Sequence, residues 1–342
     1  MTKRVLLTGA SGFVGSHVLR HLLVNTNWEI VCPVTFTHKG VQDRIRISIE
    51  DHPEYLKRVK LVHVDLSAPL STVTAHAFGR IDYVLNLASE SHVDRSIEEP
   101  APFVINNVQL ICHLLDWARN TDHLEKFVHI STDEVYGPAE IGHDHVEWQD
   151  LHFPSNPYSA SKAAQEDICY AYWRTYGVPL IMTNTMNIIG EMQDVEKFVP
   201  LVIKKVLAGD RVQLHGNDDG EFGSRFYLHA RNQADALMHI LNTQEVNHYG
   251  VYNPVRVPER FHVVGEQELD NLQMAQLISD AIGKPLNYEI VDFRAGRPGH
   301  DLRYALDGKR LADTGWTAPL SLETSLENTV RWTLEHPEWL SL

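Results

Sequence analysis

The stretch Ser131-Thr132-Asp133-Glu134 places a hydroxyl and two adjacent carboxylates directly after the mostly apolar run Phe127-Val128-His129-Ile130. This run predicts a short buried strand, so the acidic pair is expected at the carboxyl edge of a sheet, where open α/β folds bind ligands. Two neighbouring carboxylates repel each other and favour one shared proton, which suits a reaction that needs an acid and a base. A turn or N-cap role for Asp133 and Glu134 is the alternative.

A second chemical pair is Tyr158 and Lys162, which are four residues apart in a segment, 156–176, that predicts a helix. At this spacing the two side chains are neighbours on one helical face. A tyrosinate can take the proton of an alcohol while a nicotinamide takes the hydride. Free tyrosine has a pKa of about 10, so ionisation at pH 7 needs about 4 kcal/mol. We expect Lys162 to lower the pKa of Tyr158 by about 1 to 3 units, and the oxidised nicotinamide to supply the rest.

Near the N-terminus, the apolar run Val5-Leu6-Leu7 leads into Thr8-Gly9-Ala10-Ser11-Gly12-Phe13-Val14-Gly15. This spacing predicts a strand, a glycine turn and a helix that begins near Phe13 and Val14. Gly9 would permit the turn, Gly12 would let the backbone approach a pyrophosphate, and Gly15 would let the helix pack on the strand. The sequence thus predicts a dinucleotide site here rather than a purely structural turn.

The choice between NAD and NADP depends on the end of the second predicted strand, residues 29–34, where an acid would bind the ribose 2′-hydroxyl. No acid is there, and Thr35 and Lys39 follow instead. A hydroxyl and a cation could hold a 2′-phosphate, which favours NADP modestly, although Lys39 could equally be a solvated loop residue. The other predicted cofactor contacts lie in the glycine turn and on the helix at 156–176, at the ends of the strands predicted at 61–66 and 82–88, directly after the second of these strands, and on the helix at 104–117: Phe13, Val14, Tyr158, Lys162, Asp65, Leu66, Leu87, Ala88, Ser89 and Asn107.

Composition places the 342-residue chain, with 43% hydrophobic and 22% charged residues, among globular proteins of one large or two moderate domains. Its three cysteines are widely spaced, which indicates a reducing compartment, and we expect the cytoplasm. We expect no membrane partner, because the first apolar run is too short for a signal peptide or a membrane span. A net charge of −15 argues against a nucleic-acid partner.

The triplet His143-Asp144-His145 could suggest a metal site. Because adjacent ligands on a loop are usually hydrated, we expect no metal there.

The predicted elements alternate between strands and helices, which indicates an α/β fold: a Rossmann-type doubly wound parallel sheet with a smaller mixed α/β domain for the substrate. A sixth strand at 178–185 is expected to close the sheet. We therefore divide the chain into a dinucleotide-binding domain, 1–180, and a substrate-binding domain, 181–342, with a soft boundary that segments can cross.

Together these motifs resemble the extended short-chain dehydrogenases/reductases, in particular the sugar-nucleotide epimerase/dehydratase family and its 4,6-dehydratases. The resemblance runs nearly the whole length and rests on segments 8–15, 89–97, 131–137, 158–162, 187–190, 196–200, 297–301 and 303–304 and on Arg225. Within the family, the Thr-Asp-Glu triplet is what indicates dehydration, since epimerases usually lack the acidic pair.

The resemblance implies C4 oxidation of a nucleotide-linked hexose, elimination of water across C5 and C6, and return of hydride to C6. Thr132 and Tyr158 would act on the C4 hydroxyl, Glu134 would remove the C5 proton, and Asp133 would protonate the departing hydroxyl. It also implies NAD as cofactor, a dTDP-, UDP- or related sugar nucleotide as substrate, and a homodimer. Substrate contacts are expected from Ser91, His92, Asn187, Lys197, Arg225, Arg297 and His300.

Three positions depart from the family pattern: Val34 replaces the acid of NAD-using relatives, Ile189 an aromatic residue, and Asn232 an acid. Two other functions stay open. A 4-epimerase would need only Thr132, Tyr158, Lys162 and the cofactor. A dinucleotide-binding protein without catalytic activity could use the same fold.

Overall fold

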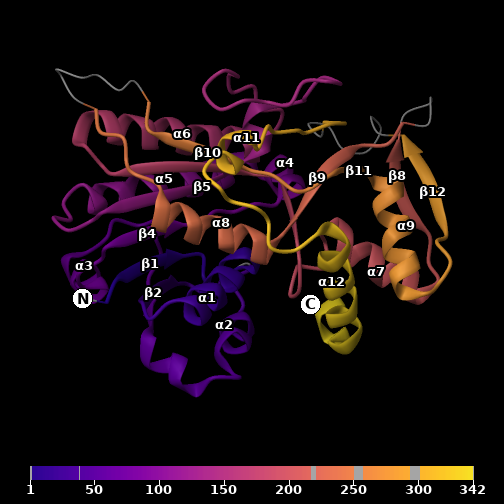
Figure 1. The fold of residues 1–342 in the computed structure, drawn as a ribbon, viewed down its shortest axis with the longest axis horizontal. Coiled ribbons are helices and arrows are strands. Elements are labelled where there is room, and N and C mark those ends of the chain that lie inside the picture. Colours follow the sequence, from indigo (N-terminus) through magenta and orange to yellow (C-terminus); the bar gives the residue numbers. More distant parts are fainter. Residues whose placement is uncertain (1, 38, 217–220, 250–256, 293–300, 342) are drawn as a thin grey trace.

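The structure is a computed structural model that describes residues 2–37, 39–216, 221–249, 257–292 and 301–341. Its central element is a seven-stranded sheet in the order β10-β6-β5-β4-β1-β2-β3, in which all neighbouring strands are parallel (Figure 1). The strands are β1 (Arg4–Thr8), β2 (Glu29–Val34), β3 (Val59–His63), β4 (Tyr83–Asn86), β5 (Lys126–Thr132), β6 (Leu180–Thr185) and β10 (Glu259–Val263). This sheet confirms the predicted Rossmann-type architecture.

The expectation that the strand at 178–185 closes the sheet is wrong, because β10 pairs with β6 and becomes the edge strand. Strand β10 contains the buried residues Arg260 and His262. These polar residues hid the strand from a search for apolar runs. Their burial is compensated by Glu166, which pairs with Arg260, and by Tyr136, which pairs with His262.

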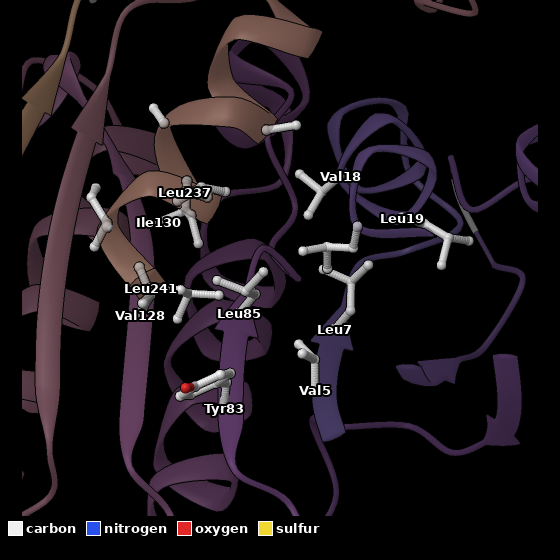
Figure 2. Packing of buried hydrophobic residues seen from close by; sticks show 14 of the residues in the cluster. Val5, Leu7, Val18, Leu19, Tyr83, Leu85, Val128, Ile130, Leu237 and Leu241 are labelled. Atoms are coloured by element: carbon white, nitrogen blue, oxygen red, sulfur yellow. The ribbon is translucent and has the colours of Figure 1, made fainter. Parts of the chain in front are cut away.

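Helices cover both faces of the sheet. On one face lie α1 (Phe13–Asn25), α2 (Gln42–Ile49) and α8 (Ala230–Thr243), and on the other lie α3 (Thr72–Phe78), α5 (Pro100–Ala118) and α6 (Pro157–Tyr176). Figure 2 shows Leu7, Leu85 and Ile130 of three neighbouring strands in the core beside Val18 of α1 and Leu237 of α8. Successive strand residues point to opposite faces, and both faces are covered, which explains the continuous apolar run at the chain start.

A smaller lobe gathers beside the carboxyl ends of the central strands. It contains the sheet β11-β9-β7 and the parallel pair β12-β8. These strands are β7 (Asn187–Ile189), β8 (Val212–Gly216), β9 (Ser224–His229), β11 (Glu268–Asp270) and β12 (Tyr288–Asp292), and they pack with α7 (Phe198–Ala208), α9 (Asn271–Ile282) and α12 (Leu322–Glu335) around a second core. The short elements are η1 (Pro53–Arg58), α4 (Val93–Glu98), η2 (Asp133–Tyr136), α11 (Lys309–Ala312) and η3 (Pro337–Leu340).

The division at residue 180 stays a proposal. Helix α8 and strand β10 come from the second half of the sequence but pack with the first, as a soft boundary allows. Within the described ranges, each helix is too short or too polar to cross a lipid bilayer.

Candidate active site

A ladder of buried polar side chains aligns the carboxyl ends of β1, β4 and β5. Thr8 Oγ1 donates to Asn86 Oδ1 at 2.7 Å, and the Asn86 amide lies 3.0 Å from His129 Nδ1. The backbone N–H of Ala88 donates to Thr8 Oγ1 at 3.0 Å. The three strand ends are therefore held in register at the edge where the predicted site residues converge.

The acidic pair lies at this edge, where β5 ends at Thr132 and the single turn η2 begins at Asp133. Thr132 Oγ1 donates to Asp133 Oδ1 at 2.8 Å, and the backbone N–H of Glu134 donates to the same oxygen at 3.0 Å. The Asn156 amide donates to Glu134 Oε2 at 3.2 Å. Asp133 is buried, and its second oxygen, Oδ2, makes no hydrogen bond with the described residues. Thr132, and not the acidic pair, is the N-cap of η2, and one carboxylate oxygen of Asp133 is left over for chemistry.

Both carboxyl groups hold their protons more tightly than usual. Burial raises the pKa of Asp133 to about 6. Hydrogen bonds from Thr132 and the backbone, and the positive charge of Arg225, lower it in part. Burial and then the charge of Asp133 raise the pKa of Glu134 to about 7. The pair can therefore hold one proton near neutral pH, which an acid–base pair requires.

Tyr158 and Lys162 lie in the first turns of α6, with Tyr158 partly exposed and Lys162 buried. Burial and then the charge of Glu134 raise the pKa of Tyr158, while a hydrogen bond with Thr132 lowers it. The phenol, Thr132 and the acidic pair are therefore close enough to influence one another, and their common catalytic role stays a prediction.

The expected action of Lys162 on Tyr158 stays a prediction, since the causes of the shifted Tyr158 pKa are burial, the two carboxylates and Thr132. Its ammonium group donates to Ile130 O at 2.8 Å and to Gln165 Oε1 at 2.7 Å. Burial lowers the pKa of Lys162 to about 8. Both residues lie on α6 at the expected spacing, and the Lys162 amine has two acceptors within the protein.

The glycine turn has the geometry that a dinucleotide requires. Gly9 has φ of 72°, and a Cβ on Gly15 would lie 2.0 Å from Gly9 O. Gly12 is the N-cap of α1, and its position provides no side-chain cap for the helix. Backbone N–H groups of the first turn, at Phe13 and Val14, therefore remain for an anionic ligand. These residues fit the pyrophosphate of a dinucleotide.

The remaining cofactor candidates lie around this turn. Leu87 and Ala88 stand against Gly9, since a Cβ on Gly9 would lie 3.0 Å from Ala88 N. Ser89 Oγ donates to Glu90 O at 3.1 Å. Asn107 is buried and bonds the backbone N–H and C=O of Glu90, so it fixes the loop that carries Ser89. A direct contact between Asn107 and a cofactor stays a prediction.

Asp65 and Leu66 follow β3, with Leu66 buried and Asp65 Oδ1 accepting from Ser67 N at 2.8 Å. After β2, Thr35 Oγ1 lies 2.8 Å from Thr37 Oγ1. Lys39 forms an ion pair of 2.9 Å with Glu196 Oε2. The cation that the sequence offered for a 2′-phosphate therefore already has an anionic partner.

The structure brings most predicted substrate residues to the same side. His92 Nε2 lies 3.4 Å from Glu196 Oε1, and Lys197 donates to Ser91 O at 3.4 Å. On β9, Arg225 lowers the pKa of both acids, so its charge lies within electrostatic range of the pair.

Asn187 is exposed on β7, opposite Tyr227 of β9 and near Arg225 of the same strand. The Arg225 guanidinium also donates to the backbone oxygens of Ser224, Asp301 and Leu302 at 2.6–2.7 Å. Arg297 and His300 lie outside the described residues.

The sequence did not reveal the residues that hold the site residues in position. Asn156, which holds Glu134, also caps α6 with a reciprocal bond to Ser159. An Asn-Pro pair before a helical pattern signals such a cap, but its reach to Glu134 has no sequence signal. The ion pair of Glu166 and Arg260, at 2.5 Å, is nearly completely buried. Because it joins residues 94 positions apart, no local sequence pattern predicts it.

Comparison with known proteins agrees with this geometry. The model of the NAD dependent epimerase/dehydratase family matches residues 5–253. The dTDP-glucose 4,6-dehydratase of Escherichia coli is 33% identical, over 98% of this chain and 95% of its own. A solved dTDP-glucose 4,6-dehydratase of Streptomyces venezuelae with NAD bound has a TM-score of 0.84 and 31% identity, with 98% of each chain covered.

A UDP-glucuronic acid 4-epimerase of Bacillus cereus has a TM-score of 0.83 at 23% identity, over 97% of this chain and 99% of its own, and shares the fold. The family model covers more than half of the chain, and the Escherichia coli relative matches nearly all of it. The chain therefore belongs to the NAD dependent epimerase/dehydratase family.

Proposed function

We propose that the protein is a nucleotide-sugar 4,6-dehydratase, an NAD-dependent hydro-lyase that converts a nucleoside diphosphate hexose into its 4-keto-6-deoxy derivative. The observation that carries the proposal is the adjacent pair Asp133 and Glu134, both with raised pKa and next to Thr132 and Tyr158. An epimerase of this fold needs the hydroxyl pair but has no use for two carboxyl groups that titrate near neutrality. The full-length relative named dTDP-glucose 4,6-dehydratase supports the same reading.

The first step is oxidation at C4 of the sugar. A nicotinamide bound beside the glycine turn would accept the C4 hydride and later return it to C6. Tyr158 takes the proton of the C4 hydroxyl, and Thr132 donates a hydrogen bond to the same oxygen. Because the pKa of Tyr158 is raised in this structure, its ionisation requires Lys162 to leave Ile130 O and Gln165 and turn toward the phenol.

Elimination follows because the C4 ketone makes the C5 proton acidic. Glu134 removes that proton, and Asp133 protonates the C6 hydroxyl, which leaves as water. In the free protein the proton favours Glu134, whose pKa is about 7 against about 6 for Asp133. Elimination therefore needs the proton to pass from Glu134 to Asp133 before the C5 proton is removed. After hydride returns to C6, Glu134 gives the proton back to C5, so the net redox change is zero.

We assign the diphosphate of the substrate to Arg225, Lys197 and Asn187, with Ser91 and His92 on the facing loop. The Arg225 guanidinium suits bidentate phosphate contacts, for which it would exchange some of its bonds to the backbone oxygens of Ser224, Asp301 and Leu302. We propose dTDP-glucose as the first substrate to test, since the curated relative of nearly equal length carries that name.

For the cofactor we propose NAD. Binding of NADP would need Thr35 and Lys39 to hold the 2′-phosphate, and Lys39 is paired with Glu196. A 2′-phosphate would have to displace that carboxylate or lie beside it. Identification of the nucleotide released from the denatured protein tests this directly.

We also propose a homodimer formed through α5 and α6, which pack together and expose Ile105 and Tyr176, 54% and 50% accessible. Light scattering after gel filtration should give twice the chain mass of 38.9 kDa. A monomer at micromolar concentration would contradict this proposal.

The experiment for the main proposal incubates the protein with dTDP-glucose, UDP-glucose and UDP-GlcNAc and assays for a keto sugar that absorbs as an enolate in alkali. We expect that product from one substrate, and its loss in Asp133→Asn and Glu134→Gln. A C4 epimer that both variants still form would instead identify an epimerase.

A further inference from the structure

The loop between η2 and α6 brings two histidines and one aspartate to a common point. His143 Nε2 lies 2.9 Å from Asp150 Oδ1, and His145 Nδ1 lies 3.4 Å from the same oxygen. One ligand atom from each of the three residues lies within 4.8 Å of the other two. The sequence showed only the triplet 143–145, in which Asp144 proves to be no part of this group, because it pairs with Arg303 at 2.7 Å.

His145 is the residue that points to a missing ligand. Its side chain is 10% exposed, its Nδ1 has Asp150 Oδ1 at 3.4 Å as its one nearby acceptor, and its Nε2 has no hydrogen-bond partner within the described residues. The ring is fixed in place, because it stacks on Tyr136 with centroids 5.2 Å apart and planes 24° from parallel. A buried imidazole with no hydrogen bond is costly, unless another species binds one of its nitrogens.

The separations fit a zinc-like ion. Zn²⁺ binds histidine nitrogen at about 2.0–2.1 Å and carboxylate oxygen at about 2.0–2.2 Å, so ligand atoms around a tetrahedral ion lie about 3.3 Å apart. The two separations from Asp150 Oδ1, 2.9 and 3.4 Å, lie on either side of this value. The two histidine nitrogens lie within 4.8 Å of each other, so an ion bound to all three atoms would sit between the two rings.

The backbone holds Asp150 in place through its second carboxylate oxygen. Asp150 Oδ2 accepts a hydrogen bond from the backbone N–H of Val146 at 2.7 Å, which directs Oδ1 at the two rings. Such outer contacts are typical of ligating carboxylates. We propose that His143 Nε2, His145 Nδ1 and Asp150 Oδ1 bind one divalent transition-metal ion, Zn²⁺ by its donor set, with water at the fourth position.

The position of the loop predicts a structural role for the ion. Arg303 donates to the backbone oxygens of Glu140 and His143 at 2.8 and 2.9 Å, and the backbone N–H of His145 donates to Ala305 O at 3.0 Å. The ion would join both histidines to Asp150 and so fasten this loop against residues 303–305. The site does not depend on the proposed dehydratase activity.

The test uses tag-free full-length protein freed of metal by a chelator and titrated with ZnCl₂ in a calorimeter. We expect one equivalent to bind, and Zn²⁺ to raise the melting temperature. His143→Ala and Asp150→Asn should each weaken binding at least tenfold and abolish the thermal shift. His143 is half-exposed, and Asn keeps an acceptor for Val146 N, so both variants are expected to fold.

His52→Ala is the matched control, since His52 forms a similar but exposed pair with Glu54 at 3.0 Å, outside this loop. It should bind Zn²⁺ like the wild type. Bound Co²⁺ should also give the visible absorption of a tetrahedral site in the wild type and in His52→Ala alone. The proposal is overturned if wild-type binding does not saturate near one equivalent, or if His143→Ala and Asp150→Asn bind Zn²⁺ within twofold of wild type.

Discussion

Replacing Glu134 by glutamine is expected to stabilise the folded protein while it removes the proposed activity. Burial and the charge of Asp133 raise the pKa of Glu134 from its ordinary 4.5 to about 7. One pKa unit corresponds to about 1.36 kcal/mol, so the charged carboxylate costs the fold up to about 3 kcal/mol. Activity should fall by about 10²- to 10⁴-fold, as for the loss of a general base.

The stability gained by Glu134→Gln is expected to increase with pH. The folded protein binds more protons than the unfolded chain between pH 4.5 and 7, so stability from this group falls as pH rises through that window. Below about pH 4.5 the carboxyl is neutral in both states and the cost is absent. Glu134→Gln should therefore gain about 3 kcal/mol at pH 8 and about 1 kcal/mol or less at pH 5. Urea unfolding at both pH values, beside the dehydratase assay, measures this.

The matched control is Glu166→Gln. Glu166 is another buried carboxylate, but Arg260 and His152 lower its pKa. Its neutralisation should destabilise the protein by about 3–5 kcal/mol at both pH values, because Arg260 would be left buried without a counter-charge. Our reasoning about the acidic pair is refuted if Glu134→Gln is less stable than wild type at pH 8, or if its gain is the same at pH 5.

Three further outcomes are expected. Tyr158→Phe should lower kcat at least a hundredfold and keep cofactor affinity within threefold, as measured by steady-state kinetics and calorimetry. Gly15→Ala should lose measurable NAD binding, because its Cβ would lie 2.0 Å from Gly9 O, and full NAD affinity in this variant would contradict the fit of the glycine turn. Lys39→Ala, which breaks the pair with Glu196, should leave NAD affinity within threefold, and a tenfold loss of NADP affinity would show that Lys39 binds a 2′-phosphate after all.

Local patterns were enough to predict the framework of the site. The apolar run of β1, the glycines after it and the helical spacing of Tyr158 and Lys162 are all short-range signals, and the structure places each as expected. The position of Asp133 and Glu134 at a strand end followed from the apolar run before them. Such features depend on neighbouring residues and are therefore legible in a single sequence.

The features that could not be predicted depend on contacts between distant segments. Strand β10 carries the buried Arg260, whose partner Glu166 is 94 residues away. Lys162 donates to Ile130 O and Lys39 pairs with Glu196, because the folded chain offers acceptors that no spacing rule reveals. The pKa of Glu134 likewise depends on burial by the assembled sheet and lobe.

The most direct test of the account follows the hydrogen at C4. Substrate dTDP-glucose deuterated at C4 is converted by the enzyme, and the product is examined by NMR. We expect a 4-keto-6-deoxy sugar with the deuterium at C6, because a nicotinamide bound beside the glycine turn would carry the hydride from C4 to C6. Deuterium that remains at C4 of an epimerised sugar would contradict it.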